Sequence, residues 1–63
     1  MDARAIWNAI EKLAKAGKIA EAWEVLPTQE QEQEYARIAE IGGYPGGYAL
    51  ARRAAYDALE DAA

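Results

Sequence analysis

Two pairs of glutamates come nearest, by residue type and spacing, to a catalytic or metal-binding site. Glu30 and Glu34 lie four residues apart and Glu21 and Glu24 lie three apart, so each pair would share one helix face. Paired carboxylates can bind a hard cation weakly or act as an acid–base couple. Such chemistry also needs a cleft that desolvates the substrate, and a chain of 63 residues has little room for one. Solvated helix faces are therefore the simpler interpretation.

The residue types that are missing exclude much of enzyme chemistry. The sequence contains no serine, cysteine or histidine, which excludes serine and cysteine triads, imidazole acid–base catalysis and disulfides. Thr28 is the only aliphatic hydroxyl, and a helix-capping role accounts for it. Calcium loops, phosphate-binding loops and dinucleotide-binding glycine motifs are also absent. We expect a protein that is not an enzyme and that binds no cofactor or metal.

A segment rich in glycine and tyrosine, residues 41–48, is a better candidate for function. It holds four of the five glycines, together with Tyr44 and Tyr48. Glycine permits positive φ angles, and tyrosine is enriched at interfaces because it presents a large amphipathic surface. Tyr44, between Gly43 and Pro45, has little local structure to pack into, so one interpretation is that it projects outward as a contact residue. The other, which the pattern favours, is a connector between helices whose tyrosines fold back onto the protein.

The middle third of the chain is strongly acidic. Residues 21–40 contain six glutamates and one arginine, a net charge of −5, whereas the whole chain carries −4. A negative chain is a poor ligand for nucleic acid or anionic membrane, but it is attracted to a basic protein surface. Spaced carboxylates can stand in for phosphates in a groove that holds nucleic acid. The predicted partner-binding residues are Glu30, Glu32, Glu34, Tyr35, Glu40, Tyr44 and Tyr48.

Apolar residues recur at helical spacing in the first half of the chain. The sequence predicts one helix from an N-cap at Asp2 to Gly17. Its apolar face comprises Ala3, Ile6, Ile10 and Leu13, with Trp7 and Ala14 on the flank. A short second helix follows over residues 19–26 and ends at Pro27. The single glycine between the two stripes indicates a tight helical hairpin.

Two further helices are predicted in the second half. Thr28 and Gln31 have the spacing of a capping box, and the helix that they begin runs to a C′ glycine at Gly42. Arg37 in this helix can pair with glutamates three residues away on either side. Pro45 suits the first position of the last helix. Its inner face comprises Tyr48, Ala51, Ala55, Leu59 and Ala62, and Tyr56 lies away from that face.

These patterns predict an all-α fold, a compact bundle of three to four helices that forms a single domain over residues 1–63. The second helix is short, and the glycine–tyrosine segment precedes the last one. No strand is expected, because alternating patterns are missing and β-branched residues are scarce. Sixteen residues are alanine, so the core should be small. Its expected members are Ile6, Ile10, Leu13, Ile19, Trp23, Val25, Leu26, Ile38, Ile41, Leu50 and Leu59.

In size, acidity, alanine-rich helices and lack of catalytic residues, the chain resembles small phage-encoded inhibitors, including anti-CRISPR proteins. The resemblance spans the whole chain and implies blockade of a nucleic-acid-binding complex of the host by protein–protein contact, for instance as a DNA mimic. The predicted function is therefore a non-enzymatic module that occupies a basic or nucleic-acid-binding surface. The acidic helix and the glycine–tyrosine segment would make the contact.

Two alternatives remain open at this stage. A de novo designed or purely structural miniprotein would have no partner, and the capping box and alanine-rich helices fit that origin. A homo-oligomer such as a homodimer would complete a thin core by pairing its tyrosine-bearing faces. The longest apolar run is too short to span a membrane, and residues 1–20 lack the apolar core of a signal peptide. We expect a cytoplasmic protein.

Overall fold

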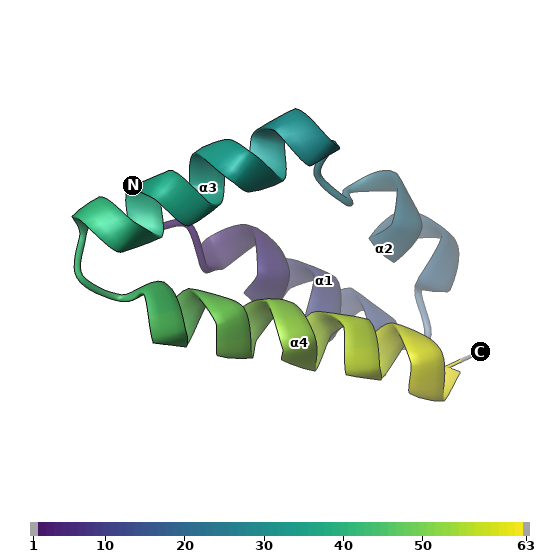
Figure 1. The fold of residues 1–63 in the computed structure, drawn as a ribbon. Coiled ribbons are helices and arrows are strands. Elements are labelled where there is room, and N and C mark those ends of the chain that lie inside the picture. Colours follow the sequence, from purple (N-terminus) through teal and green to yellow (C-terminus); the bar gives the residue numbers. More distant parts are fainter. Residues whose placement is uncertain (1, 63) are drawn as a thin grey trace.

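The computed structural model describes residues 2–62, which form four α-helices and no strand. The helices are α1 (Ala5–Lys15), α2 (Ile19–Glu24), α3 (Gln29–Ile41) and α4 (Pro45–Ala62). α1 and α4 lie side by side and run in the same direction, α2 lies at one end, and α3 returns along α4 (Figure 1). The predicted all-α bundle with a short second helix is confirmed.

The core is centred on Trp7 and Ile10, the two largest side chains that are fully buried. The Trp7 ring meets Tyr48 edge-on with the ring centroids 6.4 Å apart, and it lies 5.5 Å from Tyr56. Most other buried residues are alanines, whose small side chains let the helices approach closely. These alanines are Ala3, Ala14, Ala22, Ala39, Ala55 and Ala58. Tyr48 and Leu59 complete the buried set.

Four residues expected in the core lie at the surface instead. Trp23, Val25, Ile41 and Leu50 have exposed fractions of 55%, 40%, 80% and 71%. Successive residues of a helix point about 100° apart. When an alanine faces the core, the residues close to it along the helix therefore point toward other sides. Ala22 is buried directly before Trp23, and Ala39 is buried two positions before Ile41.

The inner face of α1 is rotated from its predicted position, whereas that of α4 is largely confirmed, since Tyr48, Ala55 and Leu59 are buried and only Ala62 is exposed. On α1, Trp7 and Ala14 are buried, whereas Ile6 and Leu13 are only half-buried. On α4, the prediction that Tyr56 lies away from the inner face is wrong, because its ring packs on the indole of Trp7. An indole buries more apolar area than an isoleucine or leucine side chain, and this favours the rotation that centres Trp7.

Schellman motifs end both α1 and α3. The φ angles of Gly17 and Gly43 are +81° and +83°, a region that residues with a Cβ rarely adopt. After α3, the amide of Tyr44 donates to the carbonyl of Ala39 at 2.9 Å. Gly42 still has a right-handed φ of −76°. The C′ position of α3 therefore belongs to Gly43, and not to Gly42 as predicted.

α3 and α4 begin where the sequence predicts. The Thr28 hydroxyl accepts from the Gln31 amide at 3.2 Å, and the Gln31 side chain accepts from the Thr28 amide at 2.9 Å, so the capping box is confirmed. α4 begins at Pro45. Gly46, Gly47 and Tyr48 consequently belong to its first turn, and only residues 42–44 connect the two helices.

Asp2 is not the N-cap of α1, which begins at Ala5 with Arg4 in the cap position. The Asp2 carboxylate accepts from the guanidinium of Arg4 at 3.0 Å and from its backbone amide at 2.9 Å. These hydrogen bonds, first of all those from the side chain, lower the pKa of Asp2. The carboxylate of Asp2 thus stabilises a turn that precedes α1.

Gly43→Ala should destabilise the protein by about 1 kcal/mol, because alanine resists the positive φ angle at this position. Gly46→Ala is the matched control, since Gly46 lies in the first turn of α4 with open space where a Cβ would sit. Alanine is the better helix former, so this change should stabilise by up to about 1 kcal/mol. Urea unfolding measures the free energy of unfolding of both variants. Equal changes in this free energy would contradict the positive φ angle of Gly43.

The two tryptophans should respond very differently to truncation. Trp7 is fully buried, so Trp7→Ala should cost about 3–5 kcal/mol, enough to unfold a chain of this size. Trp23 is 55% exposed, so Trp23→Ala should cost less than about 1 kcal/mol. Circular dichroism during thermal melting distinguishes the two variants. A molten Trp23→Ala variant would be inconsistent with the surface position of Trp23.

Candidate functional site

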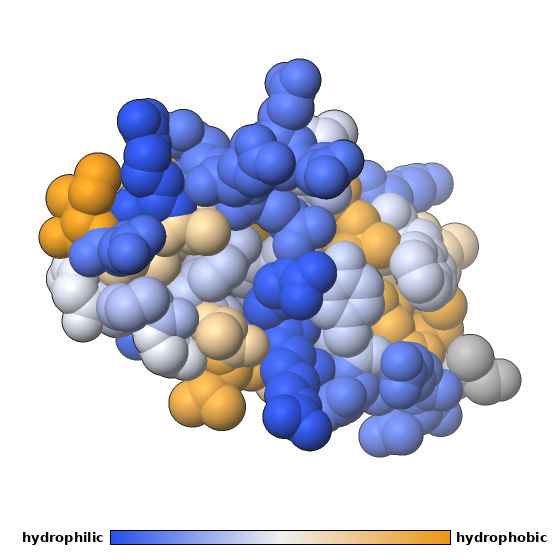
Figure 2. All heavy atoms as spheres, viewed as in Figure 1, coloured by the Kyte–Doolittle hydropathy of each residue, from blue (hydrophilic) through white to orange (hydrophobic). Residues whose placement is uncertain are grey.

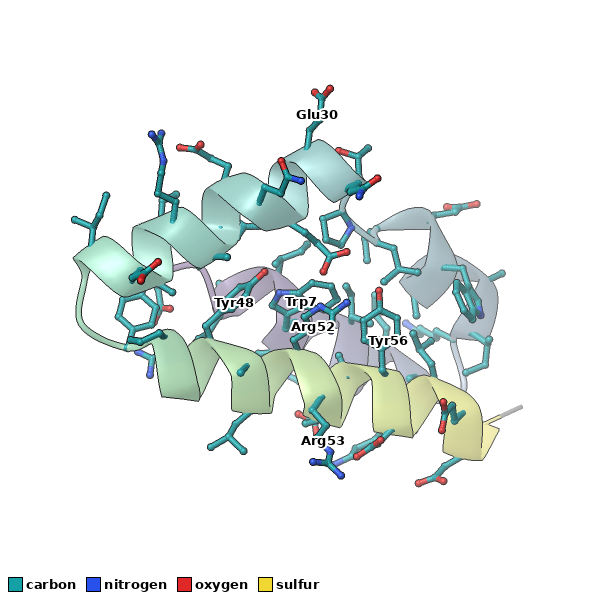
Figure 3. The ribbon with its side chains drawn as sticks, in the orientation of Figure 1. Trp7, Glu30, Tyr48, Arg52, Arg53 and Tyr56 are labelled. Atoms are coloured by element: carbon teal, nitrogen blue, oxygen red, sulfur yellow. The ribbon has the colours of Figure 1, made fainter. Side chains whose placement is uncertain are left out.

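The solvent side of α3 presents exposed carboxylates. Glu30 points away from the bundle, and Glu34 and Glu40 are exposed as well (Figure 3). Hydrophilic residues gather over this helix (Figure 2). Along α3 only Ala39 is buried, so the helix turns most of its polar side chains to solvent. Three of the predicted partner-binding acids are therefore accessible on one helix.

Glu34 is engaged by a neighbour on the same helix. Its two carboxylate oxygens accept from Nη2 of Arg37 at 2.9 and 3.0 Å. This hydrogen bonding raises the pKa of Arg37. The predicted pairing with Glu34 is confirmed, whereas no bond joins Arg37 to Glu40 in residues 2–62. Among the described residues, Glu30 and Glu40 are left without an ion pair on this helix.

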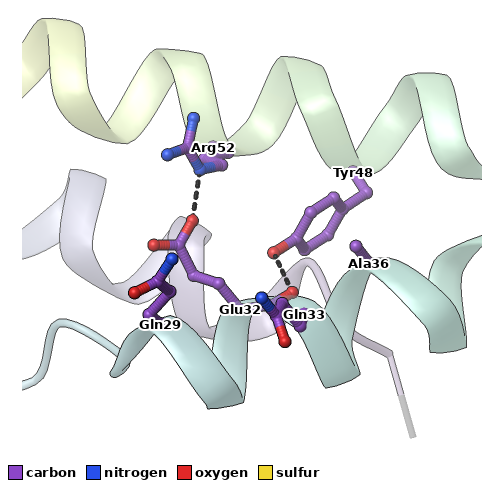
Figure 4. Close-up of a pocket in the computed structure, with 6 residues that line it drawn as sticks. All are labelled: Gln29, Glu32, Gln33, Ala36, Tyr48 and Arg52. Atoms are coloured by element: carbon purple, nitrogen blue, oxygen red, sulfur yellow. Dashed lines mark hydrogen bonds and ion pairs between the residues drawn. The ribbon is translucent and has the colours of Figure 1, made fainter.

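Glu32 turns inward and links α3 to α4. Its carboxylate accepts a short hydrogen bond from Nε of Arg52 and forms an ion pair with it (Figure 4). The hydrogen bond is the largest cause of the raised pKa of Arg52. The carboxylate of Glu32, predicted as a partner contact, is thus already used within the fold.

An open groove of about 510 Å³ lies between α3 and α4 beside this ion pair. Its lining comprises Gln29, Glu32, Gln33, Ala36, Tyr48 and Arg52 (Figure 4). The Tyr48 hydroxyl donates to the backbone carbonyl of Glu32 at 3.4 Å and closes one part of it. The groove offers amide, carboxylate and guanidinium groups to a polar side chain of a partner, and it is too open to desolvate a substrate.

Arg52 also covers the aromatic core. Its guanidinium carbon lies 5.7 Å from the ring centroid of Trp7 and 4.9 Å from that of Tyr56. Figure 3 shows these side chains grouped between α3 and α4. Sequence reasoning missed this cluster, although a signal was present. Tyr48, Arg52 and Tyr56 follow one another at intervals of four residues, which places them on one helix face.

The tyrosines of the glycine-rich segment turn toward the protein. The Tyr44 hydroxyl accepts from the Ala3 amide at 3.0 Å, and the guanidinium of Arg4 lies 4.5 Å from its ring centroid. Tyr48 is buried, and Tyr35 on α3 is half-buried. Of the two interpretations, the connector whose tyrosines fold back is therefore confirmed, and Tyr44 does not project outward. The Schellman turn before Tyr44 reverses the chain and directs its ring onto the start of α1.

Two further observations bear on metals and membranes. Within residues 2–62, no three acidic side chains lie close enough together to hold a metal ion. None of the helices in this range is both long and apolar enough to cross a membrane.

Comparisons with protein-family models, with curated proteins and with solved structures find no match to this chain. The functional interpretation therefore rests on the residues and geometry described above. The likeness to anti-CRISPR proteins in size and composition stays an expectation.

Glu32→Gln should loosen α3 from α4 and lower the free energy of unfolding by roughly 0.5–1 kcal/mol. The loss is modest because the pair is partly exposed, with side-chain exposures of 46% for Arg52 and 24% for Glu32. Glu30→Gln removes the same charge from the outer side and should cost only about 0.3 kcal/mol. Urea unfolding at low and high salt measures both. The cost of Glu32→Gln beyond that of Glu30→Gln should shrink with salt. If the two variants cost the same at low salt, the ion pair between Glu32 and Arg52 does not hold α3 to α4.

Proposed function

We propose that this protein is a non-enzymatic binding module that docks the solvent side of α3 onto a basic surface of a protein partner. The observation that carries the proposal is that Glu30 and Glu40 are exposed and have no ion pair among the described residues. Their charge is not compensated within the fold, so it remains available to a cationic partner. A net charge of −4 would also speed the encounter with such a surface.

A surface that holds nucleic acid is the partner surface that fits best. Arginine and lysine side chains arranged for phosphates also bind carboxylates, since both anions accept charge-assisted hydrogen bonds. A rigid helix holds its carboxylates at fixed spacing, which lowers the entropy lost on binding. Occupation of the surface would inhibit the partner, as the likeness to anti-CRISPR proteins implies.

The predicted site residues take different parts in this proposal. Glu30, Glu34 and Glu40 would contact the partner, with Gln33 at the edge of the groove. The remaining predicted residues would act indirectly, because they hold α3 and its connector against the bundle. These residues are Glu32, Tyr35, Tyr44 and Tyr48.

The test compares two variants that lose the same number of charges. Glu30→Gln/Glu34→Gln/Glu40→Gln neutralises the solvent side of α3, and Asp57→Asn/Glu60→Gln/Asp61→Asn neutralises exposed acids of α4. Immobilised protein is exposed to bacterial lysate at low and high salt. We expect capture of a nucleic-acid-binding protein by the original chain and by the α4 variant, and at least about tenfold weaker capture by the α3 variant and at high salt.

A second measurement establishes whether the contact inhibits. The captured protein is purified, and its affinity for DNA or RNA is measured with increasing amounts of each variant. Competition by the original chain and by the α4 variant, but not by the α3 variant, supports the proposal. Equal losses in both variants would indicate non-specific attraction, and no capture at either salt would favour a structural protein without a partner.

A further inference from the structure

An open apolar hollow lies along α1, on a side of the helix other than the one formed by its buried residues Trp7, Ile10 and Ala14. It has a volume of about 440 Å³ and is lined by Ala9, Lys12, Leu13, Ala16 and Lys18. Its base consists of two exposed alanines and the half-buried Leu13. The small side chains leave room for a large apolar group from another molecule.

Two cations border this hollow without partners of their own. Lys12 and Lys18 are exposed and make no ion pair within residues 2–62, whereas Lys15 between them is bound to Glu11 at 3.1 Å. An apolar surface bordered by ammonium groups without ion pairs is unusual in a chain of net charge −4. The occupant that this surface fits is a large apolar side chain with a carboxylate next to it.

The same chain carries a group with this chemistry on α2. Trp23 is 55% exposed, and tryptophan is among the residue types most enriched at the energetic centre of interfaces. Glu24 follows Trp23 on the same short helix, exposed and without an ion pair among the described residues. Figure 2 shows apolar residues gathered around α2. Ile41 and Leu50 are more exposed, but an indole offers a larger apolar area than either of these side chains.

We propose that two copies of this chain associate, with Trp23 of one copy seated in the α1 hollow of the other. The carboxylate of Glu24 then faces the ammonium groups of Lys12 and Lys18. Both halves of the contact, complementary in charge and in apolar character, are present on one chain. The contact also buries apolar surface that the small core cannot cover. It leaves the solvent side of α3 free, so it is independent of the function proposed above.

Sedimentation velocity over a range of protein concentrations tests this association. The original chain should shift from monomer to dimer as concentration rises, and less so at high salt. Trp23→Ala and Lys12→Glu/Lys18→Glu should each remain monomeric, yet a mixture of the two should form a 1:1 dimer, because one intact contact is restored. Ile41→Ala, which truncates a more exposed apolar residue elsewhere, should dimerise like the original chain. So should Glu30→Gln/Glu34→Gln/Glu40→Gln.

Acrylamide quenching of tryptophan fluorescence gives a second readout that needs no variant. Trp7 is already buried, so a fall in quenching with rising concentration reports the burial of Trp23. Original chain that stays monomeric, or quenching that does not change with concentration, would overturn the proposal. Dimers that survive both the Trp23 and the lysine substitutions would overturn it too, because another surface would then hold the copies together.

Discussion

The packing of Trp7 between α1 and α4 is the contact on which the rest of the structure depends. An indole fits between two close helices only if their other facing residues are small, and the buried alanines of α1 and α4 meet that need. Tyr48 and Tyr56 flank the ring, and Arg52 covers it. The indole N–H has no hydrogen-bond partner among the described residues, which costs about 1–3 kcal/mol. The apolar area and aromatic contacts of this large ring offset that cost.

α3 is held to this centre mainly by its ends and by one ion pair. The capping box fixes its start, the Schellman turn at Gly43 fixes its end, and Glu32 ties its first half to Arg52. Tyr35 and Ile38 supply half-buried contacts, and Ala39 is its only buried residue. Because so little of the helix is needed for the core, most of its surface is free to carry charge. The acidic character of α3 is therefore compatible with folding and available for a partner.

The charges of the molecule are separated by element. α3 carries the free carboxylates of Glu30 and Glu40, whereas the apolar hollow of α1 is edged by Lys12 and Lys18. Under the two proposals, these surfaces of opposite sign would serve two contacts, one with a basic partner and one with a second copy. Since the two surfaces share no residue, each can be altered without the other. The buried Tyr48 and the half-buried Tyr44 and Tyr56 belong to neither surface and serve the fold.

The sequence by itself determined the four helices and several of their ends, because capping, proline and glycine signals act within a few residues. The start of α1 and the C′ residue of α3 were not among them. The box at Thr28, the start at Pro45 and the all-α class are confirmed on that basis. It also determined the acidic character of α3, which is a matter of composition. Only the tertiary structure decided which faces turn inward, since a choice between Ala22 and Trp23, or between Ala39 and Ile41, depends on how closely another helix approaches. In an alanine-rich chain, hydrophobic residues are spread around each helix, so periodicity alone cannot define the centre of the buried face. That centre is instead set by the arrangement that packs the largest ring best.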